Sequence, residues 1–281
     1  MPTLAQALSQ AQSLGLERLD AQLLLLHAMG RPTAQRAWLL AHDADDLPAA
    51  AQAILNACVQ RRAGGEPLAY ITGHKEFFGL DLLVDARVLI PRPDTETLVE
   101  WALEVLPAQT PAAEPARVLD LGSGSGAIAL ALKATRADLQ LSAVDVSEDA
   151  LSVARENAKR LKLEIDFQQG SWLSGVREKY HAIVSNPPYV AAHDPHLEAL
   201  RHEPSQALSA GADGLQDIRQ IITAAGAHLR PGGWLLLEHG FNQAAAVREL
   251  LQLAGFVNVQ SRRDLSGIER CSGGRTAHGN Y

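Results

Sequence analysis

The second half of the sequence alternates between short apolar runs and longer helical runs, and this alternation constrains the fold more than any other feature. An alternation of this kind is typical of a parallel sheet covered by helices on both faces, which is an α/β fold. The predicted strands are 117–121, 140–145, 164–168, 181–185, 233–238 and 256–261. The predicted helices between and after them are 126–135, 147–162, 213–229 and 242–254. The polar, Gly-rich end, Cys271–Tyr281, is placed to add a terminal antiparallel strand, although its strand propensity is poor.

Residues 1–73 show no alternation and predict a separate helical bundle. Residues 3–62 are helical in pattern throughout. A first apolar run ends at Gly30-Arg31-Pro32, a second helix starts with Thr33 as its N-cap, and a third covers 48–62. This bundle either serves packing alone or docks a substrate, and its own sequence leaves both functions open.

Residues 74–92 predict a β-hairpin linker, with strand signals at 80–84 and 88–90. A third domain, 93–281, opens with a helix that the prolines and acids of Pro91-Arg92-Pro93-Asp94-Thr95-Glu96 favour at its N-terminus. Three prolines and the lack of long apolar side chains predict a surface loop at 107–115.

Composition argues against several classes of protein. The net charge of −7 and the pI of about 5.8 give no overall positive field for nucleic-acid phosphates. No apolar run is long enough for a transmembrane helix, and the N-terminus has no signal-peptide pattern. Two distant cysteines, Cys58 and Cys271, favour a reduced, cytoplasmic protein and make no zinc site by themselves. We therefore expect no metal.

A glycine-rich turn follows the strand 117–121 and opens the next helix. It contains Asp120, Gly122, Ser123, Gly124, Ser125 and Gly126. Glycines let the backbone approach a ligand closely, and the helix N-terminus points amides at the same place. Asp145 ends the next strand and can accept hydrogen bonds from both hydroxyls of a ribose. Both features also occur in dinucleotide-binding proteins, so alone they indicate only a nucleoside-like cofactor.

Two details favour S-adenosylmethionine over NAD. The spacing is Gly-x-Gly-x-Gly, and Asp120 just before it can reach an ammonium group, directly or through water, which NAD lacks. Trp172, after the third strand, can lie against an adenine ring. The alternatives are a helix-capping role for Asp120 and a partly buried loop position for Trp172.

Asn186-Pro187-Pro188-Tyr189 ends the fourth strand, beside the first. An amide or aromatic amine is a poor nucleophile, so its site needs two acceptors that hold the NH2 group and aim the nitrogen at a methyl group. The Asn186 side-chain oxygen and the Pro187 carbonyl can be these acceptors, and the prolines make the corner rigid. Tyr189 can stack on the planar group near the sulfonium. We expect Asn186 to border the donor as well, and no general base is required.

The chain resembles the PrmC/HemK family, the protein-(glutamine-N5) methyltransferases of peptide chain release factors. The resemblance covers nearly the whole chain and rests on the helical N-terminus, the glycine-rich turn and Val184-Ser185-Asn186-Pro187-Pro188-Tyr189-Val190. Its most specific element is Ile90-Pro91-Arg92-Pro93-Asp94-Thr95-Glu96.

The resemblance implies a Rossmann-like, seven-stranded class I methyltransferase sheet with S-adenosylmethionine as donor and S-adenosylhomocysteine as product. It implies the glutamine of a Gly-Gly-Gln loop as acceptor, and a release factor as partner without direct nucleic-acid or membrane binding. Gly122–Gly126 and Asp145 would hold the donor with Trp172 near adenine, and Asn186–Tyr189 would hold the glutamine.

Two alternatives stay open. An amino-methylase of nucleic-acid bases has a similar Asn-Pro-Pro-Tyr corner. It predicts a basic surface around Asn186, and Lys and Arg clustered on one face of the N-terminal region would favour it. A donor-binding module without activity is the other alternative. His239 beside Glu238 suggests a metal pair, but no third ligand stands at suitable spacing.

Overall fold

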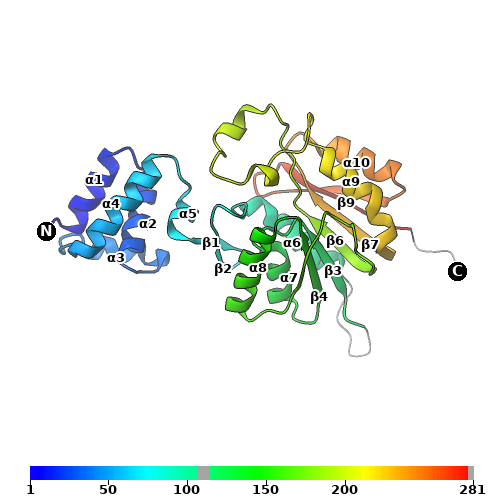
Figure 1. The fold of residues 1–281 in the computed structure, drawn as a ribbon, viewed down its shortest axis with the longest axis horizontal. Helices are drawn as coiled ribbons and strands as arrows, with labels where there is room; N and C mark the ends of the chain where they lie inside the picture. Colours follow the sequence, from blue (N-terminus) through cyan, green and yellow to red (C-terminus); the bar gives the residue numbers. More distant parts are fainter. Residues whose placement is uncertain (107–113, 278–281) are drawn as a thin grey trace. The chain divides into compact units, whose positions relative to one another are not determined.

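The chain forms two compact units, Met1–His74 and Lys75–Tyr281, in a computed structural model that describes residues 1–106 and 114–277 (Figure 1). The predicted surface loop at 107–115 falls largely outside these described residues. No helix within the described ranges has both the length and the apolar character that a membrane span needs. Cys58 and Cys271 are both buried and free.

The first unit is helical, as the sequence predicts. Its helices are α1 (Leu4–Ser13), α2 (Arg18–Ala28), η1 (Thr33–Gln35), α3 (Arg36–Ala41), α4 (Ala49–Ala63) and α5 (Leu68–Thr72). Leucines from several of these helices are fully buried in one core, among them Leu4, Leu24 and Leu39. An ion pair of 2.6 Å between Arg62 and Asp20 joins α4 to α2.

Two details of the helical prediction are wrong. The first apolar run is not one helix, because Gly15 adopts φ +91° and ends α1 before α2 begins. Thr33 is not an N-cap: it is the first residue of the short 3-10 helix η1, and Gln35 precedes α3.

The predicted hairpin forms, but it is shorter than expected. Strands β1 (His74–Phe77) and β2 (Leu80–Leu83) pair across Phe78-Gly79. Residues 88–90 are not a strand, which corrects the prediction there. The backbone N–H of Ile90 instead donates to the side chain of Glu203 at 3.1 Å, so a carboxylate replaces the ladder partner. The next helix, α6 (Glu96–Val105), follows the 3-10 turn η2 (Pro93–Thr95).

The second unit is built on a seven-stranded sheet in the order β5-β4-β3-β6-β7-β9-β8. The strands are β3 (Arg117–Leu121), β4 (Gln140–Asp145), β5 (Asp166–Gln169), β6 (Tyr180–Ser185), β7 (Leu229–Glu238), β8 (Val257–Arg263) and β9 (Glu269–Arg275). The first five pair in parallel, and β9 pairs antiparallel with β7 and β8. The expected α/β class is confirmed.

Helices cover both faces of this sheet (Figure 1). On one face, α6, α7 (Ala127–Thr135) and α8 (Glu148–Leu161) pack on the alternate strand residues that include Val118 and Val184. On the other face, α9 (Gln216–Ala225) and α10 (Ala244–Leu253) pack on the complementary set, which includes Leu119 and Ile183. The buried parallel strands explain why their sequences are nearly continuous apolar runs.

The terminal strand forms in spite of its poor propensity. A Cβ on Gly273 would lie 2.6 Å from the Leu235 carbonyl oxygen and 3.0 Å from the Trp101 ring. Gly273 of β9 is therefore required by close packing against β7 and α6, and tertiary structure overrides the local preference.

Candidate active site

The two sequence features that suggested a site lie side by side at the carboxyl edge of the sheet. Leu121 of β3 is the register partner of Ser185 of β6, so Gly122 and Asn186 are the next residues on neighbouring strands. The Ser185 hydroxyl donates to the Leu121 carbonyl at 2.7 Å and ties the two strand ends together. The topology therefore brings the glycine-rich turn to the Asn-Pro-Pro-Tyr corner, as expected for ligand sites in open α/β sheets.

A cavity of about 220 Å³ opens at this junction. Six predicted site residues line it, namely Gly122, Gly124, Asp145, Trp172, Asn186 and Pro188. Two segments that the sequence did not indicate complete its walls, 87–89 and 204–207 together with Asp217 of α9. Nothing local marks these residues as site residues, because only the chain's path through space brings them here.

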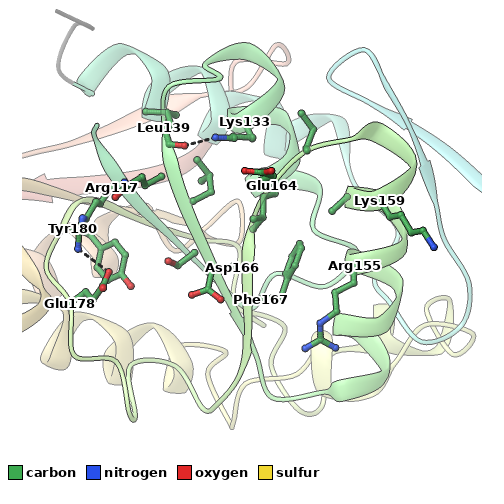
Figure 2. Close-up of a pocket in the computed structure, with 16 residues that line it drawn as sticks. Arg117, Lys133, Leu139, Arg155, Lys159, Glu164, Asp166, Phe167, Glu178 and Tyr180 are labelled. Carbon is green, nitrogen blue, oxygen red and sulfur yellow. Dashed lines mark hydrogen bonds and ion pairs between the residues drawn. The ribbon is translucent and has the colours of Figure 1, made fainter. Parts of the chain in front are cut away.

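A larger hollow of about 640 Å³ lies at the opposite, amino edge of the sheet, where β3, β4, β5 and β6 begin (Figure 2). Several of its charged side chains are engaged with protein groups. Arg117 pairs with Glu178 at 3.0 Å, and Lys133 donates to the Leu139 carbonyl at 2.7 Å. Size therefore does not identify the site: the smaller cavity has the convergent backbone and carboxylate groups.

The glycine-rich turn folds against Asp145. The Gly122 N–H donates to the Val144 carbonyl at 2.8 Å, and the Gly124 N–H donates to Asp145 Oδ2 at 2.8 Å. Asp145 Oδ1 accepts from Ser147 at 2.9 Å, and burial raises the pKa of this carboxyl. Gly122 and Gly124 both have positive φ, and this conformation leaves bare backbone facing the cavity.

Asp120 lies beneath the turn rather than in the cavity wall. It is fully buried, and its Oδ2 accepts from the backbone N–H of Ala129 at 3.2 Å, inside the first turn of α7. Its Oδ1 has no hydrogen-bond partner among the described residues. Burial raises the pKa of Asp120 to about 7. The helix-capping alternative therefore accounts for Oδ2. Oδ1 is a buried acceptor without a donor, and such a group needs an explanation.

Ser123, Ser125 and Gly126 also lie outside the cavity wall, and their part in donor binding stays a prediction. Gly126 adopts φ +82°, and a Cβ there would lie 3.2 Å from the Cβ of Ala154 on α8. Buried Asn157 on the same helix donates to the Ser125 carbonyl at 3.1 Å and also binds Leu83. Helix α8 therefore supports the turn from behind, a role that the sequence analysis missed.

Trp172 lies directly against the glycine-rich turn. A Cβ on Gly122 would meet the indole ring at 3.3 Å, so a glycine is needed for this contact. Trp172 itself has φ +49°, which is rare for a bulky residue and marks a position held by its surroundings. Burial raises the pKa of Asp217, and a hydrogen bond from the Trp172 side chain opposes that rise.

At the other side of the cavity, the corner residues meet the start of α6. The side-chain NH2 of Asn186 donates to the Thr95 hydroxyl oxygen at 3.2 Å. The Tyr189 hydroxyl donates to Glu238 Oε1 at 3.3 Å, at the end of β7. Pro187 is buried, whereas Asn186, Pro188 and Tyr189 are half-buried.

Arg92 and Glu203 lie next to residues of the cavity wall. They form an ion pair of 2.5 Å, and Glu203 also accepts from the Ile90 N–H. These bonds join two segments whose neighbouring residues, Leu89 and Pro204, line the cavity. His239, considered above as a metal ligand, uses both ring nitrogens inside the protein, on the Gly240 carbonyl and the Ser272 hydroxyl.

The sheet order, the glycine-rich turn with its acidic partner on β4 and the Asn-Pro-Pro-Tyr corner define a class I methyltransferase that uses S-adenosylmethionine. Comparison with known proteins agrees. Residues 97–261 match the methyltransferase small domain, and residues 3–73 match the PrmC N-terminal domain.

Similar curated proteins are called release factor glutamine methyltransferase. The one from Pseudomonas aeruginosa is 49% identical over 92% of this chain and 93% of its own, and the one from Escherichia coli is 45% identical over 97% of both. The one from Coxiella burnetii is 47% identical over 90% of each chain. The chain belongs to this family.

Solved structures support the fold. A methyltransferase from Pyrococcus furiosus superposes with a TM-score of 0.54 over 79% of this chain and 98% of that chain, at 18% identity. A human methyltransferase 10 domain containing protein superposes with a TM-score of 0.54 over 72% of this chain and 90% of that chain, at 19% identity.

Proposed function

We propose that the chain transfers a methyl group from S-adenosylmethionine to the side-chain amide nitrogen of the glutamine in the Gly-Gly-Gln motif of peptide chain release factors, and so tunes translation termination in the cytoplasm. The observation that carries this proposal is the nearly full-length similarity to enzymes named for that reaction, which includes the helical unit. The placement of Asn186 beside Gly122 supports it, because donor and acceptor sites then share one edge.

The residues present suit the donor. Gly122 and Gly124 offer bare backbone to it, Asp145 can accept from its ribose hydroxyls, and the Trp172 ring can lie against its adenine. The buried Oδ1 of Asp120 is an acceptor without a donor, and an ammonium group, reached directly or through water, would satisfy it. When bound, the donor supplies an electrophilic methyl group on a sulfonium.

Catalysis would then consist mostly of positioning. Asn186 Oδ1 and the Pro187 carbonyl would accept the two hydrogens of the glutamine NH2 and hold its nitrogen in line with the methyl group. The bound donor would supply the methyl group, its C–S bond breaking as the N–C bond forms, and the methylated nitrogen, now more acidic, would lose its proton to water. No general base is needed for this sequence.

The alternative of a nucleic-acid amino-methylase gains no support from the helical unit. Residues 1–74 contain five arginines, no lysine and six acidic residues. Two of these arginines, Arg61 and Arg62, are in ion pairs with Glu66 and Asp20. The basic cluster that would favour this alternative is therefore missing from these residues.

The direct test uses labelled S-adenosylmethionine with a release factor and with its Gln→Asn variant at the Gly-Gly-Gln loop. We expect label in the release factor alone, since the shorter side chain places its nitrogen out of reach. Labelling of both proteins, or of neither, would disprove the proposal. Structured RNA in a parallel reaction tests the alternative substrate.

Donor affinity should depend on pH through Asp120. Because its pKa is raised to about 7, the carboxyl is protonated below that pH and cannot pair with an ammonium group. The fraction that is charged rises about eightfold between pH 6 and pH 7.5, so the Kd of the donor should fall about five- to tenfold over this range. Isothermal calorimetry measures it.

Asp120→Asn is the matched control, because it keeps an acceptor for the Ala129 N–H but cannot ionise. It should bind the donor weakly and with a much flatter pH profile. Asp145 and Glu238 also have raised pKa values, so an unchanged profile in Asp120→Asn would assign the dependence to them instead.

A further inference from the structure

A buried carboxyl group stands behind the corner that is proposed to hold the glutamine. Glu238 is the last residue of β7, and the four residues before it, Trp234–Leu237, are apolar. Its side chain is buried, with 1% exposed. Glu238 forms no ion pair within 4.0 Å with any described residue. At longer range, the charge of Arg270 lowers the pKa of Glu238 and the charge of Asp94 raises it. Burial raises the pKa of Glu238 to about 7. A group this costly to bury is expected to have a function.

Two active-site hydroxyls act on the Glu238 carboxyl. Tyr189 donates to Oε1 at 3.3 Å. The Thr95 hydroxyl lowers the pKa of the same carboxyl, as a nearby donor does, although the two groups lie outside normal hydrogen-bond geometry. Oε2 has no hydrogen-bond partner among the described residues, so it remains available to accept the Thr95 proton.

Thr95 connects the carboxyl to Asn186. Thr95 is 4% exposed in the turn that starts α6, and its oxygen accepts the Asn186 NH2 at 3.2 Å. A hydroxyl has a single proton. When that proton points to Glu238, the Thr95 oxygen can only accept from Asn186. The Asn186 amide must then place its NH2 on Thr95, which leaves its oxygen Oδ1 for another group.

This orientation is the one that the proposed chemistry needs. An Asn186 amide rotated by 180° would give Oδ1 to Thr95 and turn its NH2 toward the glutamine NH2, so two donors would face each other. We propose that Thr95 and Glu238 are positioning residues that fix the orientation of the Asn186 amide for the acceptor. The same carboxyl holds the Tyr189 hydroxyl, so one buried group orients both side chains of the corner. The inference rests on the proposed function, since it assumes that Asn186 binds the glutamine.

The test compares Thr95→Val, which keeps the shape and removes the hydroxyl, with Thr95→Ser, which keeps the hydroxyl. The kcat/KM for the release factor should fall about 10- to 100-fold in Thr95→Val and stay within about threefold in Thr95→Ser. The Kd for S-adenosylmethionine should change less than about twofold in both. Thr135→Val is the matched control, because Thr135 bonds only a backbone carbonyl within α7.

Glu238→Gln supplies the second arm. A glutamine NH2 can donate to the Thr95 oxygen and release the Thr95 proton toward Asn186, so this variant should also lose at least about tenfold. Because Thr95 and Glu238 act as a unit, the variant that combines Thr95→Val with Glu238→Gln should have a kcat/KM no lower than that of the less active single variant.

Three results would each overturn the inference. The losses of kcat/KM could multiply in the double variant, Thr95→Ser could be as inactive as Thr95→Val, or the affinity for S-adenosylmethionine could fall as much as kcat/KM. If Thr95→Val does not fold, an unchanged kcat/KM in Glu238→Gln overturns it as well. Asn186→Ala in the same assay separates the two levels. If the unaltered protein does not label the release factor, the proposed function is wrong. If Asn186→Ala is active, the assumption that Asn186 binds the glutamine is wrong, and the inference fails with it. If Asn186→Ala is inactive while Thr95→Val is fully active, only the positioning inference is wrong.

Discussion

Asn186→Ala should lower the rate of methyl transfer by about a thousandfold or more while the donor still binds. The amide group supplies one of the two acceptors that would hold the glutamine NH2, and a delocalised amide nitrogen reacts only when it is aimed at the methyl group. Asn186 also lines the cavity that is proposed for the donor, but the glycine-rich turn, Asp145 and Trp172 would remain in place. Donor binding should therefore weaken by no more than about threefold.

Single-turnover transfer from labelled donor and calorimetric donor binding measure the two effects separately. Asn242→Ala is a matched control, since Asn242 is exposed in the turn after β7 and does not line the cavity. An equal loss of donor binding in Asn186→Ala would make Asn186 a donor-binding residue instead. Retained transfer would exclude it from catalysis.

The sheet could be predicted from the sequence because burial on both faces imposes the pattern directly. Strands β3 and β4 begin and end at the predicted residues, since their apolar runs stop where the chain leaves the core. The terminal strand shows the limit of such reasoning. Gly273 lowers local propensity, yet the Leu235 carbonyl and the Trp101 ring require it. The segment 88–90 shows the opposite limit. Its residues favour a strand, but the Ile90 N–H is bound by a carboxylate 113 positions away.

The candidate site was predictable only where a motif marks it. The glycine-rich turn and the Asn-Pro-Pro-Tyr corner are continuous in sequence, and each contributes two residues to the cavity wall, Gly122 and Gly124 from the turn and Asn186 and Pro188 from the corner. Asn157 and Asp217 carry no such mark, because each acts through a contact with a distant element. Thr95 belongs to the stretch that carries the family resemblance, but that stretch does not indicate its contact with Asn186. Glu238 alone had a usable signal, since a carboxylate after an apolar strand must be satisfied or serve a function.

The second large effect concerns Gly214, which lies in the turn before α9 with φ +73°. A Cβ there would stand 2.2 Å from the Tyr189 carbonyl oxygen and 2.9 Å from its carbonyl carbon. That oxygen also accepts from the Gln243 side chain at 3.1 Å, so the backbone after the corner is fixed from two sides. Gly214→Ala must therefore move Tyr189, and with it the groups that aim the glutamine.

We expect Gly214→Ala to lower kcat/KM for the release factor by about 100-fold, because a displacement near 1 Å is enough for such a loss. It should also lower the free energy of unfolding by about 2–4 kcal/mol, of which about 1 kcal/mol comes from a side chain at positive φ. Activity assays and denaturant unfolding measure these two quantities.

Gly211→Ala separates strain from displacement. Gly211 has the same φ of +73°, but its Cβ would mainly meet the side chain of Gln216, 2.7 Å from Oε1, which can swing away. It should therefore lose about 1 kcal/mol of stability and less than about threefold in kcat/KM. Equal losses in the two variants would show that backbone strain alone is responsible. A fully active Gly214→Ala would show that the Tyr189 backbone is not critical, and the positioning account of catalysis would then lose its support at this corner.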